Sequence, residues 1–224
     1  PLQLAIEKQN IQLIKRLLLF NDIDVNFISS RYTNDENILK NRIENAPIHM
    51  AVESQNIEII KLLLSNPSID VNSKSYHYYN CMSFEYIKSY EKTALHIAIE
   101  LNKIDIIQLL LNHPKINVND KMIYGLVKIK NGGFGKFFIH KGIKEIKPTL
   151  IMALEGKNEQ IIHLLTLNKK LNINCKSVVC TEQTLYADFD LHGTRFESKI
   201  EEKSIHEYSD LLPKFLKRKV DDIK

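Results

Sequence analysis

The 224-residue chain has no tryptophan, only three cysteines and seven glycines, and no long apolar run. Its longest apolar segments, in RLLLF and IIKLLL, fall short of the roughly 18 to 20 residues that a membrane-spanning helix needs, so we expect no membrane partner. Three cysteines cannot all pair with one another, and none belongs to a C-x-x-C unit. We therefore expect free thiols in a reducing compartment, the cytoplasm or the nucleus.

A strong charge of one sign is also missing. The formal net charge is +4, which is too small to indicate nucleic-acid binding by itself. The first residue is Pro1 rather than methionine, and no basic region with an apolar segment lies ahead of the first apolar run. We therefore expect neither a secretory signal nor a natural start here, and interpret the stretch as part of a longer chain.

What the sequence does contain is an internal repeat, which must be recognised first because it determines the whole fold. The third copy reads TALHIAIELNKIDIIQLLLNHPKINVN, and the second, APIHMAVESQNIEIIKLLLSNPSIDVN, aligns with it without a gap. The first copy lacks only the opening residue, and the fourth is the most divergent. The copies occupy residues 1–26, 46–72, 93–119 and 148–174.

Each copy predicts two short antiparallel helices. Thr93 can cap the start of the first helix, and Pro1 and Pro47 stand at the next position, where a missing N–H costs nothing. A second apolar period follows a polar pair such as Asn102-Lys103. One such helix pair cannot bury both of its apolar faces, so neighbouring copies are expected to stack and share a core.

The stretches TALHIAIE and LLLNHPKINVN resemble the ankyrin repeat. Its Thr-Pro-Leu-His helix start is matched at 93–96 and partly at 46–49, and its Asp-Val-Asn ending at 24–26 and 70–72. The resemblance is greatest to the large ankyrin families of single-celled eukaryotes, which use Ile, Asn and Lys heavily. It implies a mostly α-helical solenoid of stacked helix-turn-helix units with inserted β-hairpin loops.

The chain departs from the ankyrin pattern in its turns and its repeat length. The glycine that usually ends the first helix is replaced by Gln9, Gln55, Asn102 or Lys157, so we expect the left-handed turn residue to follow, at positions that include Asn10, Asn56 and Asn158. The equivalent alanines, Ala5, Ala51, Ala98 and Ala153, lie 46, 47 and 55 residues apart, against a family norm of about 33.

The excess length falls between copies, where this family has a projecting hairpin loop. The insertion at 27–45 is polar, the one at 73–92 is rich in tyrosine, and the one at 120–147 holds most of the glycines and many lysines. The tyrosines have two interpretations that we leave open: a contact surface for a partner, or anchors that hold the loop on the repeats.

The segment NGGFGKFF in the third insertion suggests a phosphate-binding loop, but the register excludes it. A loop of that kind needs glycine where Lys130 stands and Ser or Thr where Phe137 stands, followed by a helix. We predict a hairpin instead, with 122–130 paired to 136–141 and the turn at Asn131-Gly132-Gly133.

The lysines of this hairpin also have two interpretations. They could attract an acidic ligand or nucleic acid, or they could keep an edge strand soluble and unpaired. Nucleic-acid binding needs a continuous basic face, and acidic residues such as Glu58 and Asp105 interrupt it. This interruption argues against a nucleic-acid partner and favours the edge-strand interpretation. The lysines are Lys121, Lys128, Lys130, Lys136, Lys141, Lys144 and Lys147.

No arrangement in the sequence is typical of catalysis or metal binding. His49 and His96 belong to the helix-start motif, where the resemblance implies hydrogen bonds between neighbouring loops. Cys175 and Cys180 lack a second pair of ligands for zinc. We expect no enzyme activity, cofactor, metal or small-molecule substrate in this chain.

The last segment, 175–224, is predicted to form a loop or short strands followed by a helix. Ser204 and Glu207 form a capping box for that helix. The helix is expected to cover the open end of the repeat stack. Its apolar face would be Ile205, Tyr208, Leu212, Phe215 and Leu216.

The resemblance implies a scaffold or adaptor that binds a protein partner through its hairpin loops and concave helix face. The family's usual contact positions correspond to Asn45, Glu53, Ser54, Lys92, Glu100, Leu101, Lys147 and Glu155. From the insertions we add Tyr78, Tyr79, Lys130, Phe134 and Lys136. Two alternatives remain: a targeting arm of a larger enzyme, and binding of nucleic acid or another acidic ligand through the hairpin 120–147.

Overall fold

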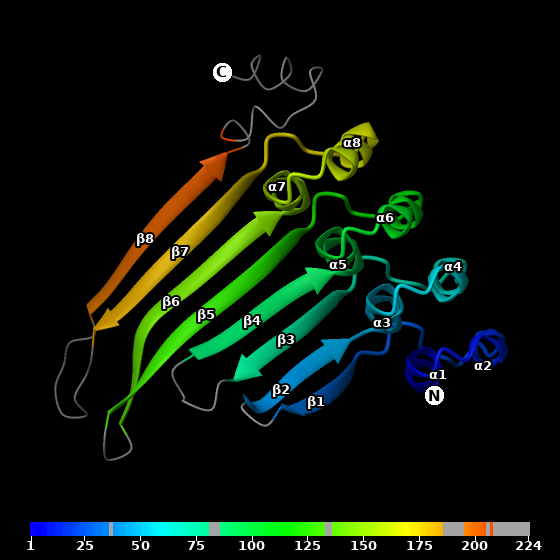
Figure 1. Cartoon of the computed structure of the whole chain (residues 1–224), viewed down its shortest axis with the longest axis horizontal. Helices are drawn as coiled ribbons and strands as arrows, with labels where there is room; N and C mark the ends of the chain where they lie inside the picture. Colours follow the sequence, from blue (N-terminus) through cyan, green and yellow to red (C-terminus); the bar gives the residue numbers. More distant parts are fainter. Residues whose placement is uncertain (36–37, 81–85, 133–135, 186–194, 205–206, 208–224) are drawn as a thin grey trace.

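The four copies fold into four stacked helix pairs in the computed structural model, which describes residues 1–35, 38–80, 86–132, 136–185, 195–204 and 207. The first helices of the pairs form an inner row, and the second helices form an outer row farther from the strands (Figure 1). The inner helices are α1 (Leu2–Glu7), α3 (Pro47–Glu53), α5 (Ala94–Glu100) and α7 (Thr149–Glu155). The outer helices are α2 (Ile11–Leu17), α4 (Ile57–Leu64), α6 (Ile104–Leu111) and α8 (Glu159–Leu167). We number the pairs repeats 1 to 4.

Every repeat is followed by a β-hairpin, and the four hairpins pair edge to edge in chain order to form one antiparallel sheet of eight strands. Figure 1 shows this sheet extending away from the helices. The expectation of a mostly α-helical chain is therefore not confirmed, because the hairpins join into one large sheet. The strands are β1 (Ser29–Asp35), β2 (Ile38–Asn45), β3 (Lys74–Asn80), β4 (Tyr86–Thr93), β5 (Lys121–Gly132), β6 (Lys136–Pro148), β7 (Lys176–Leu185) and β8 (Arg195–Ser204).

The core runs continuously through the stack. Alanine occupies the same place in every inner helix, and Ala51 and Ala98 are completely buried, which lets neighbouring backbones approach closely. The outer helices contribute large aliphatic side chains such as Ile60, Ile107 and Leu110, none of which is exposed. Each of these is worth roughly 1.5–3 kcal/mol in burial, so the repeated apolar positions dominate the stability of the stack.

The turn inside each repeat differs from the prediction. The left-handed residue is the one that replaces the family's glycine: Gln9, Gln55, Asn102 or Lys157, with φ between 50° and 57°. The left-handed conformation costs each of these non-glycine residues about 1 kcal/mol in backbone strain. The asparagines that follow in three of the repeats have negative φ and cap the outer helix instead, as Asn56 Oδ1 does by accepting from the N–H groups of Glu58 and Ile59.

The third insertion forms the predicted hairpin, but with longer strands. The predicted turn residues Asn131 and Gly132 belong to β5, where they pair with Phe137 and Lys136. The interpretation of its lysines as protection for an edge strand is wrong for Lys128 and Lys144, which lie inside the sheet. β5 pairs with β4 as far as Lys128, and β6 pairs with β7 over Gly142–Ile146.

Close packing within the sheet accounts for one of the clustered glycines. Gly125 in β5 lies directly opposite Ser89 in β4, and a Cβ at this position would stand 2.5 Å from the Ser89 hydroxyl oxygen. In the neighbouring register position, the rings of Tyr90 and Tyr124 pack with centroids 5.0 Å apart. The glycine thus lets β4 and β5 approach where two aromatic rings and a serine meet.

The segment after repeat 4 begins with strands, within the alternatives predicted for it. Residues 176–185 and 195–204 form a fourth hairpin, β7 and β8, in which Ser204 pairs with Lys176. The predicted capping helix, with its apolar face Ile205, Tyr208, Leu212, Phe215 and Leu216, lies outside the described residues.

Candidate partner-binding surface

Six of the thirteen predicted contact residues lie in one row where the inner helices meet the bases of the hairpins. Every inner helix ends in a glutamate: Glu7, Glu53, Glu100 and Glu155. The residue eight positions earlier, at the end of the preceding strand, contacts this glutamate in repeats 2 to 4. Asn45 Nδ2 donates to Glu53 Oε1 and Oε2 at 3.1 and 3.0 Å, Lys92 Nζ lies 2.6 Å from Glu100 Oε2, and Lys147 Nζ lies 2.5 Å from Glu155 Oε2.

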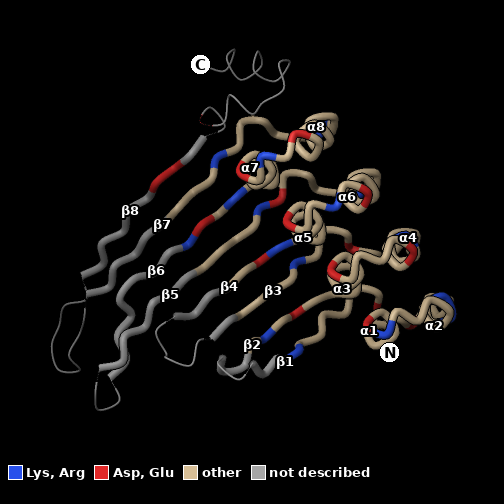
Figure 2. The backbone as a smooth tube through the Cα atoms, viewed as in Figure 1, with Lys and Arg blue, Asp and Glu red and all other residues tan. Residues whose placement is uncertain are grey.

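We call these seven residues, together with Arg31 of β1, the carboxylate row. Arg31 joins the first two repeats, because its guanidinium lies 3.6 Å from Glu7 and 4.0 Å from Glu53. Figure 2 shows the alternation of acidic helix ends with basic residues on the strands. The row therefore presents both signs of charge at a regular spacing along the stack.

The electrostatics differ along the row. Burial raises the pKa of the Glu53 carboxyl, although the Asn45 hydrogen bond and the charges of Arg31 and Lys92 oppose this shift. Burial lowers the pKa of Lys147, but hydrogen bonds from its ammonium group to Glu155 and Glu145, together with their charges, outweigh it, and the net pKa is raised. Lys147 is thus held as a cation between two carboxylates.

Two hollows open along this surface. One, of about 190 Å³, lies between repeats 1 and 2 and is lined by Glu7, Arg31, Glu53 and Ser54 among others. The other, of about 690 Å³, lies between repeats 3 and 4, with Glu100, Glu155 and Gly156 in its wall. The structure thus brings predicted contact residues from three repeats to one surface, with room beside them for side chains of a partner.

The remaining predicted contacts are more scattered. Tyr78 on β3 is 40% exposed, and Leu101 after α5 is half-buried. Residues of the tyrosine-rich insertion differ in their surroundings: Tyr90 packs in the sheet, with Lys92 Nζ 4.6 Å from its ring, whereas Tyr78 is exposed. A partner contact at Tyr78 stays a prediction. The side chains of Tyr79, Lys130 and Lys136, and all of Phe134, lie outside the described residues.

The histidines of the helix-start motif are structural. His49 Nδ1 accepts from the Ala46 N–H at 3.1 Å, and its Nε2 lies 2.9 Å from the Ser73 carbonyl oxygen. His96 Nδ1 accepts from the Thr93 N–H at 3.1 Å, and its Nε2 lies 3.1 Å from Thr149 Oγ1 in the next repeat. Burial lowers the pKa of each histidine to about 4, so both are neutral near pH 7.

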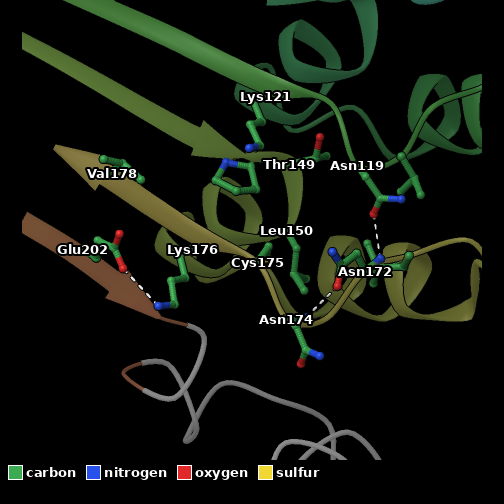
Figure 3. Close-up of a pocket in the computed structure, with 13 residues that line it drawn as sticks. Asn119, Lys121, Thr149, Leu150, Asn172, Asn174, Cys175, Lys176, Val178 and Glu202 are labelled. Carbon is green, nitrogen blue, oxygen red and sulfur yellow. Dashed lines mark hydrogen bonds and ion pairs between the residues drawn. The ribbon is translucent and has the colours of Figure 1, made fainter. Parts of the chain in front are cut away.

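Sequence reasoning missed Arg31 and a further pocket. Only the pairing of β1 with β2 brings Arg31 to the row, and nothing local to its sequence indicates this. The pocket, of about 290 Å³, lies between repeat 4 and the start of β7, with Asn119, Lys121, Cys175 and Lys176 in its wall (Figure 3). Lys176 is engaged with Glu202 at 2.9 Å.

No cluster of three or more histidine, cysteine, aspartate or glutamate side chains suited to a metal occurs among the described residues. Within the same residues, no helix combines the length and apolar character needed to cross a membrane.

The repeated helix pairs agree with a comparison with protein families. A family model described as ankyrin repeats (3 copies) matches residues 2–122, which is more than half of the chain. No curated protein sequence matches the chain. The fourth helix pair lies beyond the matched range but stacks on the third in the same way, with α7 against α5 and α8 against α6. The chain belongs to the ankyrin repeat family.

Proposed function

We propose that the chain is a non-enzymatic protein-binding module whose partner lies along the carboxylate row. Ankyrin repeats in general mediate protein–protein interactions. The observation that supports this site is the convergence of contact positions from repeats 2, 3 and 4 on one surface that also holds two hollows. Such a surface fits an extended protein segment better than a compact ligand, because the hollows lie between different pairs of repeats.

The chemistry of the row favours a polar partner segment. Its carboxylates are partly neutralised by Arg31, Lys92 and Lys147, so a partner gains most by supplying hydrogen-bonding groups of both kinds. The side chains of Lys92 and Lys147 are only 15% and 13% exposed, whereas those of Glu100 and Glu155 are 38% and 32% exposed. A partner on this surface therefore meets the carboxylates first.

A matched pair of serines tests the location of the site. Ser54 follows α3 beside the row, and Ser65 follows α4 on the outer face. Both are exposed, both have right-handed backbone angles, and both hydroxyls donate to a carbonyl three residues back, at 2.9 and 2.8 Å. Ser54→Arg and Ser65→Arg therefore add the same bulk and charge, and each removes one equivalent hydrogen bond.

Proteins captured by the intact chain are purified, and the affinity of each for the intact chain and for both variants is measured. We expect Ser54→Arg to weaken binding about tenfold or more and Ser65→Arg to leave it unchanged, since only the first enters the row. Equal affinities for the two variants would place the binding site elsewhere.

A further inference from the structure

The N-terminal end of the stack exposes a concentrated apolar surface. Among the described residues, nine large apolar side chains are exposed, and seven of them lie within the first 32 residues. We call six of these the N-terminal face: Leu4, Leu13, Phe20, Phe27, Ile28 and Tyr32. The seventh, Leu19, lines a hollow together with Leu62 and Ser65 of repeat 2. Large apolar surfaces of this kind mark interaction sites in folded proteins.

The repeats themselves show what kind of surface this is. Leu4 is 59% exposed, yet the residues at its place in repeats 2 to 4 are at most 8% exposed. Leu13 is 43% exposed, and its counterparts are at most 2% exposed. The same positions are buried wherever a repeat precedes and open only in repeat 1, so they face the preceding helix pair. The counterparts are Met50, Ile97 and Met152 for Leu4, and Ile59, Ile106 and Ile161 for Leu13.

A ladder of asparagine side chains, each hydrogen-bonded to the backbone of the next repeat, also ends unpaired at repeat 1 within the described residues. Asn26 of repeat 1 donates to the Ser68 carbonyl at 2.7 Å and accepts from the Asp70 N–H at 2.8 Å. Asn72 and Asn119 make the same two bonds to the repeats that follow them. The matching groups of repeat 1 are the Asp22 carbonyl and the Asp24 N–H, and no preceding repeat exists among the described residues to bond them.

The sheet repeats its register at each joint between hairpins. Glu44 pairs with Tyr76, Glu91 with Ile123, and Ile146 with Val178. In each pair one residue is the fourth after the asparagine that closes a repeat (Asn72, Asn119 or Asn174), and the other is the third before an inner helix. The equivalent residue in the first hairpin is Ser30, which is exposed on β1. Within the described residues β1 pairs with β2 alone, so its outer edge is open.

We propose that the N-terminal face docks a further helix pair of this repeat type, whose hairpin pairs with β1 and runs into α1 as β2 runs into α3. The apolar positions, the ladder groups and the strand edge are three separate features, and each continues the interface already present between the repeats. This site is distinct from the carboxylate row and does not depend on the function proposed for it.

A fused repeat tests the proposal on the full chain. Residues 47–93 are duplicated in front of Pro1, which corresponds to Ala94, so that the added Thr93 takes the capping position before α1. The added Glu91 would then pair with Ser30. We expect the urea midpoint to rise on the order of 0.5 M and the slope m to increase, because more surface is buried on folding.

The control is the double variant Leu4→Gln/Leu13→Gln, made with and without the added repeat. We expect it to leave the midpoint of the unfused chain within about 0.2 M, since both side chains are exposed there, and to remove the gain in the fused chain. An added repeat that leaves the midpoint unchanged, or a gain that survives the double variant, overturns the proposal. Sedimentation of the unfused chain tests a second copy as the occupant: a dimer that the double variant dissociates would also overturn it.

Discussion

The helix pairs repeat nearly the same side chains, whereas the hairpins between them share few and nevertheless pair in the same register. In the helices, Ala51 and Ala98 occupy one place and make one kind of contact. In the sheet, the register positions occupied by Tyr76, Ile123 and Val178 are filled by different residue types. The stack fixes where each hairpin starts, and backbone hydrogen bonds, which do not depend on side-chain type, then join the hairpins.

The largest predicted effect falls on the helix side of this comparison. Leu110→Ala removes a completely buried side chain from α6 and should cost about 2–5 kcal/mol of unfolding free energy, measured by urea denaturation. Leu19→Ala, at a position that is 81% exposed, serves as the control and should stay within about 0.5 kcal/mol. Similar losses for both variants would contradict the stacked core.

A second prediction concerns the buried histidines that link the repeats. Burial lowers the pKa of His49 and His96 to about 4 in the folded chain, against an ordinary value of 6.5. Below about pH 6.5 each histidine binds a proton in the unfolded chain but not in the folded one. The free energy of unfolding therefore has its full value above about pH 6.5 and falls by about 1.4 kcal/mol per pH unit for each histidine as the pH decreases toward 4. Urea titrations at several pH values measure this slope. A stability that stays flat between pH 6.5 and 4.5 would show that the histidines are not buried as described.

A smaller effect is expected in the sheet. Gly125→Val places side-chain atoms against the Ser89 hydroxyl, which must move, and should cost about 1–3 kcal/mol. The same substitution in a Ser89→Gly background should cost less, because the obstructing side chain is absent. Equal costs in the two backgrounds would mean that β4 and β5 do not meet at this pair.

The sequence was sufficient to predict the helix pairs, because they depend on local patterns, whereas the contact positions stay a prediction. The period of apolar residues marks each helix, and the family's motif carries Glu53 and Glu100 to the inner surface. The joining of the hairpins could not be predicted, since pairing between insertions depends on where the stack places them. Arg31 was missed for the same reason. The left-handed turn was misplaced by one residue because Gln55 and Lys157 adopt an angle that side chains usually avoid.

The account rests most heavily on the continuous sheet, because the sheet sets the spacing of the hairpin bases in the carboxylate row. Native-state hydrogen exchange of the β4 and β5 amides across the joint from Tyr86–Lys128 to Glu91–Ile123 tests it directly. We predict protection at this joint comparable to that of the amides in α5 and α6. Exchange at this joint as fast as in an unfolded chain, with the helices still protected, would show that the hairpins project separately and would contradict the account.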